Sequence, residues 1–182
     1  SKGVKRAAGE VLATNAELRH SMRHDQLTGL PNRRYMREFL DMSLSQAKRH
    51  QHKVGLFQVD LIDFRLINDT RGHAVGDLVL QRVAGLVRCE SRKGDFVARI
   101  GANEFAVICS FARDLEELET LSGRICDLIT EPFEIDGVAC ELKCAAAIVL
   151  SEDGEVDPVR FQKDVDIALD EAKQQGNGAS VV

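Results

Sequence analysis

Apolar residues recur along this chain with two different periods, which predict helices alternating with strands. The continuous apolar run at 54–61 predicts a buried strand, and a short helical turn is expected at about 62–67. The runs at 96–98 and 105–108 predict the two arms of a β-hairpin. Helical spacing predicts further helices after Asn32, from Asp77, over about 114–130 and from Pro158 through about Gln175.

A second hairpin is predicted near residue 136. Asp136-Gly137 is a favoured pair for a type I′ turn, and it lies between the apolar segments 133–135 and 138–150. Strands that alternate with helices, together with two hairpins, indicate an α/β (α+β) fold in which helices flank a central mixed sheet. Asn32 is placed to cap the helix that follows it.

The first 24 residues predict one amphipathic helix. Val4, Val11 and Leu18 lie seven residues apart, which is the spacing of a coiled-coil seam. Two arrangements are open: a helix packed on its own domain, or a rigid, dimeric signalling helix that follows an upstream sensor. We expect the chain to be part of a larger protein and divide it into a helical linker (1–24), one globular domain (25–178) and a tail (179–182).

Composition narrows the functional classes. A net charge of −5 over 182 residues argues against a general nucleic-acid-binding protein, whose phosphate contacts need clustered Lys and Arg. The sequence has no apolar run near the roughly 20 residues that a membrane helix requires. We therefore expect a cytoplasmic domain, alone or as the cytoplasmic part of a larger, even membrane-anchored, protein. The five cysteines form no Cys-x-x-Cys pair, so we expect reduced, buried thiols.

Several blocks of sequence, in this order, resemble the GGDEF domain, the diguanylate cyclase family. They are DQLTGLPNRR at 25–34, VDLIDFRLIND at 59–69, GHAVGD at 72–77, GANEF at 101–105 and the segment from Val165 to Lys173. The resemblance implies a palm fold like that of nucleotidyl cyclases. It also implies a reaction in which two GTP-bound domains meet face to face and, with Mg²⁺, form cyclic di-GMP.

The resemblance assigns roles to individual residues. Asp60, the backbone carbonyl of Leu61 and the third signature residue, Asn103, would hold Mg²⁺, and Glu104 would lie with them at the catalytic centre. Four residues would bind the nucleotide: Phe64 at the phosphates, Asn68 and Asp77 at the guanine, and Lys173 at the triphosphate. From the residues alone, Asp77 could equally cap a helix, Asn68 could be a turn residue and Lys173 an ordinary exposed lysine.

The sequence departs from the family pattern where metal and triphosphate would bind. Asn103 stands where the family has Asp, and a neutral amide is a poor ligand for Mg²⁺, which prefers carboxylates. Ala102 replaces a Gly, which matters only if that residue needs a positive φ. Ile62 replaces an Asp, and the acid one place later, Asp63, is interpreted as a solvated or capping residue. Asn177 stands where the family has a phosphate-binding Arg.

A separate motif is intact. Arg92 and Asp95 form an Arg-x-x-Asp pattern, with five residues between Asp95 and Gly101. The resemblance implies that this is an inhibitory site, where Arg would contact a phosphate or guanine of cyclic di-GMP and Asp would pair with guanine N–H groups. Taken alone, the pattern could also be an exposed charged turn.

Three functions are compatible with these observations. The favoured hypothesis is a degenerate, inactive GGDEF domain that regulates or senses, binding cyclic di-GMP at Arg92 and Asp95, or GTP weakly. The alternatives are an active diguanylate cyclase with product inhibition, or a dimerisation scaffold without nucleotide. We expect Mg²⁺ only with bound nucleotide, a homodimer through the N-terminal helix or the domain face, and an adjacent phosphodiesterase or sensor domain.

Overall fold

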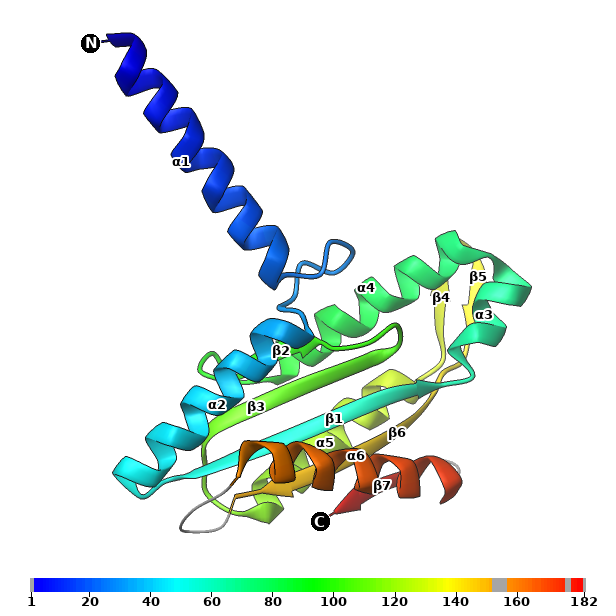
Figure 1. Cartoon of the computed structure of the whole chain (residues 1–182). Helices are drawn as coiled ribbons and strands as arrows, with labels where there is room; N and C mark the ends of the chain where they lie inside the picture. Colours follow the sequence, from blue (N-terminus) through cyan, green and yellow to red (C-terminus); the bar gives the residue numbers. More distant parts are fainter. Residues whose placement is uncertain (1, 152–156, 176–177, 182) are drawn as a thin grey trace.

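A five-stranded mixed sheet forms the centre of the molecule (Figure 1). The computed structural model describes residues 2–151, 157–175 and 178–181. The strands lie in the order β2-β3-β1-β6-β7, and β7 pairs parallel to β6 whereas the other neighbours are antiparallel. Their bounds are β1 (Lys53–Ile62), β2 (Phe96–Arg99), β3 (Glu104–Ala112), β6 (Lys143–Leu150) and β7 (Gly178–Val181). The prediction of a mixed central sheet is confirmed.

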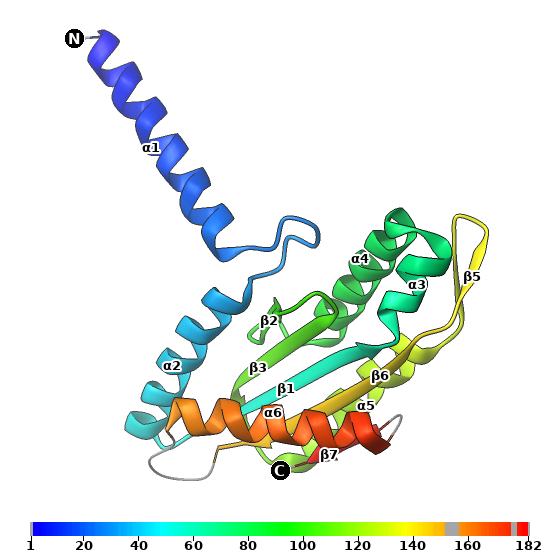
Figure 2. The ribbon, with the colours of Figure 1, turned by 45° about the vertical axis from the view of Figure 1, so that its right-hand side comes forward.

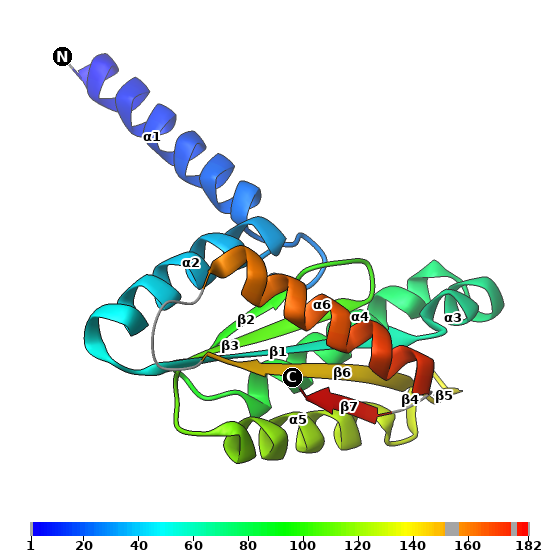
Figure 3. The same cartoon turned by 60° about the horizontal axis from the view of Figure 1, so that its bottom comes forward.

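Helices cover both faces of this sheet (Figure 3). One face packs against α4 (His73–Glu90) and α5 (Leu115–Thr130), and the other packs against α2 (Arg33–His50) and α6 (Pro158–Gln175). Successive side chains of a strand point to opposite faces. In β1 the odd-numbered Phe57, Val59 and Leu61 therefore join the α4–α5 core, and the even-numbered Val54 and Leu56 join the α2–α6 core. By the same alternation Asp60 faces α6.

The N-terminal helix α1 (Lys2–Arg23) projects away from the domain (Figure 2). The side chains of Val11, Leu18 and Met22 are each more than half exposed. The arrangement in which this helix packs on its own domain is therefore wrong, and the coiled-coil seam stays a prediction. Among the helices of the described residues, none is both long and apolar enough to span a membrane.

Asn32 ties this projecting helix to the domain. Its Oδ1 accepts a hydrogen bond from the backbone N–H of Tyr35 at 3.0 Å, which confirms the predicted cap of α2. Its Nδ2 donates to the carbonyl of Met22 at 3.0 Å, and its backbone N–H donates to the carbonyl of Arg23 at 2.8 Å. Every polar group of the Asn32 side chain thus serves the junction between the two helices.

Several predicted boundaries were wrong. Helix α4 begins at His73, so Asp77 does not cap it and lies in its second turn. The short turn at 62–67 is a full helix, α3 (Phe64–Arg71). The segment 138–150 is two strands, β5 (Val138–Cys140) and β6, because the chain leaves its small hairpin with β4 (Phe133–Ile135) before it joins the main sheet. The turn of that hairpin has positive φ at both Asp136 and Gly137, as type I′ requires.

Candidate functional site

The end of β1 and the turn before β3 bring the predicted metal-binding residues together. Asp60 lies opposite Glu104 in the β1–β3 ladder, and the N–H of Leu61 donates to the carbonyl of Asn103 at 3.0 Å. Asp60 is buried, at 6% relative exposure. A buried carboxylate requires compensating partners, and two neighbouring side chains supply them.

The first partner of Asp60 is the side-chain amide of Asn103. Nδ2 of Asn103 donates to Oδ1 of Asp60 and to the carbonyl oxygen of Leu61, both at 2.7 Å. Both neighbours are acceptors only, so the amide must present its nitrogen to them and turn its oxygen away. Asn103 therefore occupies the two oxygen atoms that would ligate a metal, and it does so as a donor.

The second partner of Asp60 is the ammonium group of Lys173 in α6. Its Nζ lies 2.6 Å from Oδ2 of Asp60 and 4.0 Å from Oε1 of Glu104. Burial alone would lower the pKa of Lys173, but the hydrogen bond and the charge of Asp60 raise it, so the lysine remains a cation. Lys173 is thus an ion-paired residue of the site rather than an ordinary exposed lysine.

These contacts do not fit a resident Mg²⁺. A Mg²⁺ ion is bound by oxygen ligands, whereas here an amide N–H₂ and an ammonium group contact the oxygens of Asp60. Within the described ranges, no group of three His, Cys, Asp or Glu side chains is arranged to hold a metal. The positive charge that a metal would supply comes instead from Lys173.

Glu104 completes the cluster on the β3 side. Its Oε2 lies 3.1 Å from the guanidinium of Arg33, whose Nε donates to the carbonyl of Ile100 at 2.6 Å. Burial and the nearby charge of Asp60 raise the pKa of Glu104 above its usual range, despite Lys173 and Arg33. Ala102 is not among the residues with positive φ in the described chain, so its Cβ adds no backbone strain.

The residues assigned to the guanine also lie close together. Asn68 in α3 touches Gly76 in α4, where an added Cβ would lie only 1.9 Å from Oδ1 of Asn68. Asp77 follows directly and is exposed, and Phe64 is buried beneath the same contact. Asp63 is exposed, with φ of 58°, which fits a solvated residue. Asn177 lies outside the described residues.

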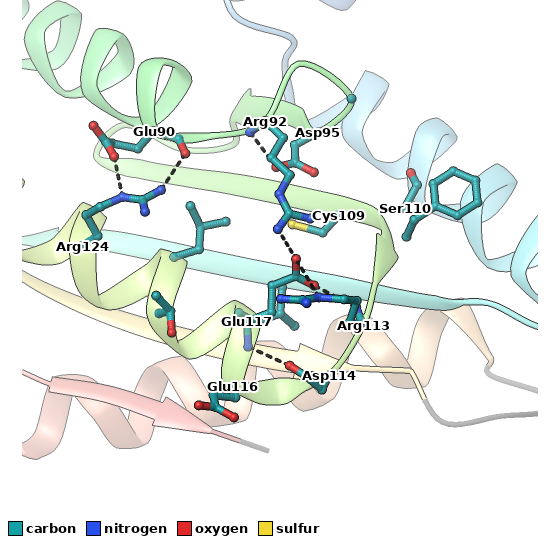
Figure 4. Close-up of a pocket in the computed structure, with 15 residues that line it drawn as sticks. Glu90, Arg92, Asp95, Cys109, Ser110, Arg113, Asp114, Glu116, Glu117 and Arg124 are labelled. Carbon is teal, nitrogen blue, oxygen red and sulfur yellow. Dashed lines mark hydrogen bonds and ion pairs between the residues drawn. The ribbon is translucent and has the colours of Figure 1, made fainter.

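The Arg-x-x-Asp motif lines a pocket of about 550 Å³, together with residues of β3 and of α5 (Figure 4). The motif is pre-organised by two backbone contacts: the N–H of Arg92 donates to Oδ2 of Asp95 at 2.8 Å, and the N–H of Asp95 donates to the carbonyl of Arg92 at 3.0 Å. The thiol of Cys109 contacts Asp95, and burial first and that carboxylate second raise the pKa of Cys109 to about 12.

Three arginines and five carboxylates line this pocket: Arg92, Arg113, Arg124, Glu90, Asp95, Asp114, Glu116 and Glu117. The guanidinium of Arg92 forms an ion pair with Glu117, and Arg124 forms one with Glu90. Motif spacing did not find Arg113, Arg124 or Glu117. The Asp114-x-x-Glu117 pattern signals a helix cap, but nothing in it places that cap beside Arg92, which is 25 residues earlier.

Comparisons with known proteins agree with this architecture. A sequence model of the family described as "Diguanylate cyclase, GGDEF domain" matches residues 22–179. The diguanylate cyclase TpbB of Pseudomonas aeruginosa is 32% identical over 166 residues, covering 91% of this chain and 38% of that protein. The solved GGDEF domain of TpbB superposes with a TM-score of 0.80 at 31% identity, covering 87% of this chain and 93% of that one.

Two further matches are a phosphodiesterase and a GGDEF domain solved with a bound ligand. The cyclic di-GMP phosphodiesterase PdeR of Escherichia coli is 32% identical over 154 residues, covering 85% of this chain and 23% of that protein. The coiled coil and GGDEF domain of DgcB from Caulobacter crescentus, solved in complex with c-di-GMP, shares the fold with a TM-score of 0.88 at 24% identity, covering 99% of this chain and 96% of that one. The chain spans between about a fifth and two fifths of the curated relatives named here.

Proposed function

Because the chain belongs to the GGDEF domain family, whose members named above act in cyclic di-GMP signalling, we propose that it is a catalytically silent member that serves as a receptor for cyclic di-GMP. The observation that carries this proposal is the contrast between its two sites. At the metal end both oxygens of the buried Asp60 are held by donors of the chain itself, whereas Arg92 of the Arg-x-x-Asp motif is 64% exposed and lies beside a pocket.

Catalytic silence follows from the partners of Asp60. Phosphoryl transfer in this family depends on metal ions that neutralise charge and position the attacking and leaving oxygens. Asn103 and Lys173 each hold one oxygen of Asp60. A nucleotide-bound Mg²⁺ would have to displace both, and would then find an uncharged amide in place of a second carboxylate. The proposed receptor therefore requires no divalent cation.

Two residues of the pocket, Arg92 and Asp95, support binding of cyclic di-GMP. Its volume of about 550 Å³ suits a ligand of this class, since ligand pockets commonly enclose 300–1,000 Å³. Arg92 offers a planar guanidinium, which pairs with phosphate or with the guanine edge through two hydrogen bonds. Asp95 is an acceptor held in place by the backbone, as pairing with guanine N–H groups needs.

A second candidate activity is weak GTP binding without turnover. Asn68 and Asp77 keep the guanine end of the family's substrate site, Phe64 is kept at the phosphate loop, and Asn68 lies against Gly76, directly before Asp77. The exposed stripe of α1 supports pairing with a second copy of the chain. The relatives include phosphodiesterases, which supports a role for such a module beside a phosphodiesterase or sensor domain in a longer protein.

Calorimetric titration with cyclic di-GMP tests the receptor. Binding by the wild-type chain that is lost in Arg92→Ala is the expected result. Arg160→Ala is the matched control, because Arg160 is 83% exposed on α6 and does not line the pocket. Absence of heat with the wild-type chain, or equal binding by Arg92→Ala, would overturn the proposal.

A further inference from the structure

Glu117 lies where an anionic ligand group would meet Arg92. Its carboxylate forms ion pairs with the guanidinium of Arg92 and with Nε of Arg113, the latter at 3.6 Å (Figure 4). Its side chain is only 10% exposed, whereas those of Arg92 and Arg113 are 64% and 75% exposed. Two exposed arginines from different segments thus contact one carboxylate, that of the largely buried Glu117.

This geometry resembles the way arginines hold a phosphate. Guanidinium groups bind carboxylate and phosphate with the same fork of N–H donors, so either anion can occupy the position between them. Arg92 comes from the loop that follows α4, and Arg113 from the segment between β3 and α5. The convergence therefore depends on the tertiary fold and not on neighbouring positions of one helix.

We propose that Arg92 and Arg113 form one phosphate subsite, and that Glu117 masks it until the ligand's phosphate displaces the carboxylate. This inference rests on the proposed cyclic di-GMP receptor and adds its regulation. The pocket's net charge acts in the same direction as the mask, since five carboxylates line it against three arginines and would repel an anionic ligand. Removal of the Glu117 charge both frees the arginines and lessens that repulsion.

Glu117 also has a structural role, and the test must separate the two. Its Oε2 accepts a hydrogen bond from the backbone N–H of Arg113, the residue before the N-cap, at 2.8 Å, and its own N–H donates to the N-cap Asp114 at 2.9 Å, an arrangement similar to a capping box at the start of α5. Glutamine at this position retains an oxygen for the backbone hydrogen bond but carries no charge. Glu117→Gln therefore removes the mask and preserves the cap.

The experiment is calorimetric titration of the whole chain with cyclic di-GMP. We expect Glu117→Gln to bind up to about fivefold more tightly than wild type, as loss of a competing ion pair with exposed arginines implies. Glu116→Gln, in the same helical turn and lining the same pocket, is the matched control and should match wild type. Arg113→Ala in the Glu117→Gln background should abolish the gain. Thermal unfolding of each variant verifies that α5 is intact.

The outcomes separate this inference from the receptor itself. If wild type binds and Glu117→Gln binds no more tightly, the mask is overturned and the receptor stands. If Glu117→Gln binds and wild type does not, the subsite and its mask are supported, and the proposal that the wild-type chain itself acts as a receptor fails. If neither chain binds, the receptor and the mask both fail. An equal gain in Glu116→Gln would also overturn the mask, because general charge reduction would then explain the effect.

Discussion

The side-chain amide of Asn103 donates to Oδ1 of Asp60 at 2.7 Å, across the two strands that would hold the metal in a cyclase. Because of this contact, Oδ1 of Asp60, which would otherwise be free to ligate a metal, already accepts a hydrogen bond from Asn103. Asn103 in place of the family's Asp therefore does more than remove one negative charge. In the folded chain its amide also donates two hydrogen bonds, to Asp60 and to the carbonyl of Leu61.

The first prediction concerns divalent cations. The wild-type chain should have the same Tm in EDTA and in millimolar Mg²⁺, because Lys173 already neutralises Asp60. Asn103→Asp should be less stable in EDTA by about 1–3 kcal/mol, since it replaces a donor with a second carboxylate beside the buried Asp60, and Mg²⁺ should restore the loss. Asn103→Ala is the control, with lower stability but no response to Mg²⁺. A wild-type Tm that rises with Mg²⁺ would contradict this account.

A second prediction concerns turnover. Incubation with GTP and Mg²⁺ or Mn²⁺, followed by chromatography, should give no cyclic di-GMP with the wild-type chain. Production by Asn103→Asp would show that the missing carboxylate is the main lesion. If that variant is folded and responds to Mg²⁺ yet is inactive, at least one further residue needed for turnover is missing. Asn177, which stands where the family has a phosphate-binding Arg, is then the next residue to change. Steady product formation by wild type would establish the active-cyclase alternative.

Ionisation of two carboxylates should change the free energy of unfolding in opposite directions: that of Glu104 lowers it and that of Asp25 raises it. Burial raises the pKa of Glu104, so ionisation costs the folded state stability as pH rises above about 4.5. Glu104→Gln removes that cost, and its stability relative to wild type should therefore improve from pH 4 to pH 7.

Asp25 provides the matched comparison. Burial opposes its ionisation, but hydrogen bonds from Thr28 and Arg99 outweigh this and lower the pKa of Asp25 below 3.8. Its contribution is present at neutral pH and is lost as pH falls through the folded-state pKa. Asp25→Asn should therefore be destabilising at pH 7, with a cost that shrinks toward pH 3. Denaturant unfolding across this range measures both variants, and equal signs would contradict the assignment.

The junction at Asn32 can be weakened without loss of its helix cap. Asn32→Asp keeps an oxygen to accept from Tyr35 N–H but has no donor for the Met22 carbonyl. We expect near-wild-type stability of the domain and faster hydrogen exchange over residues 20–31. Asn32→Ala, which loses both contacts, should also cost about 1 kcal/mol of stability. Unchanged exchange in Asn32→Asp would show that the backbone contact to Arg23 suffices.

Cysteine reactivity should follow exposure and ionisation. Cys89 is exposed, whereas Cys109 is buried and its pKa is raised to about 12, so little of it is thiolate at pH 8. Iodoacetamide should therefore modify Cys89 well before Cys109, as mass spectrometry of the digested chain would measure. Labelling should reach Cys109 only on unfolding. Equal rates in the folded chain would show that the pocket opens to solvent on the timescale of labelling.

The amino-acid sequence by itself determined the family, the order of most elements and the position of the signature turn, because periodicity and capping are local properties. It also located Asn32 as a cap and the Asp136-Gly137 turn, since both depend on a few adjacent residues. It misplaced the start of α4 and gave no sign of β7, which exists by pairing with β6 about 30 residues earlier.

Only the tertiary structure decided what the unusual residues do. Whether Asn103 presents nitrogen or oxygen depends on Asp60 and Leu61, about 40 residues away on the neighbouring strand, and whether Lys173 is exposed or paired depends on how α6 packs over β1. The meeting of Arg92 with Glu117 depends on the packing of two separate segments. Electrostatic and hydrogen-bond partners are set by distance in space, which local sequence patterns do not encode.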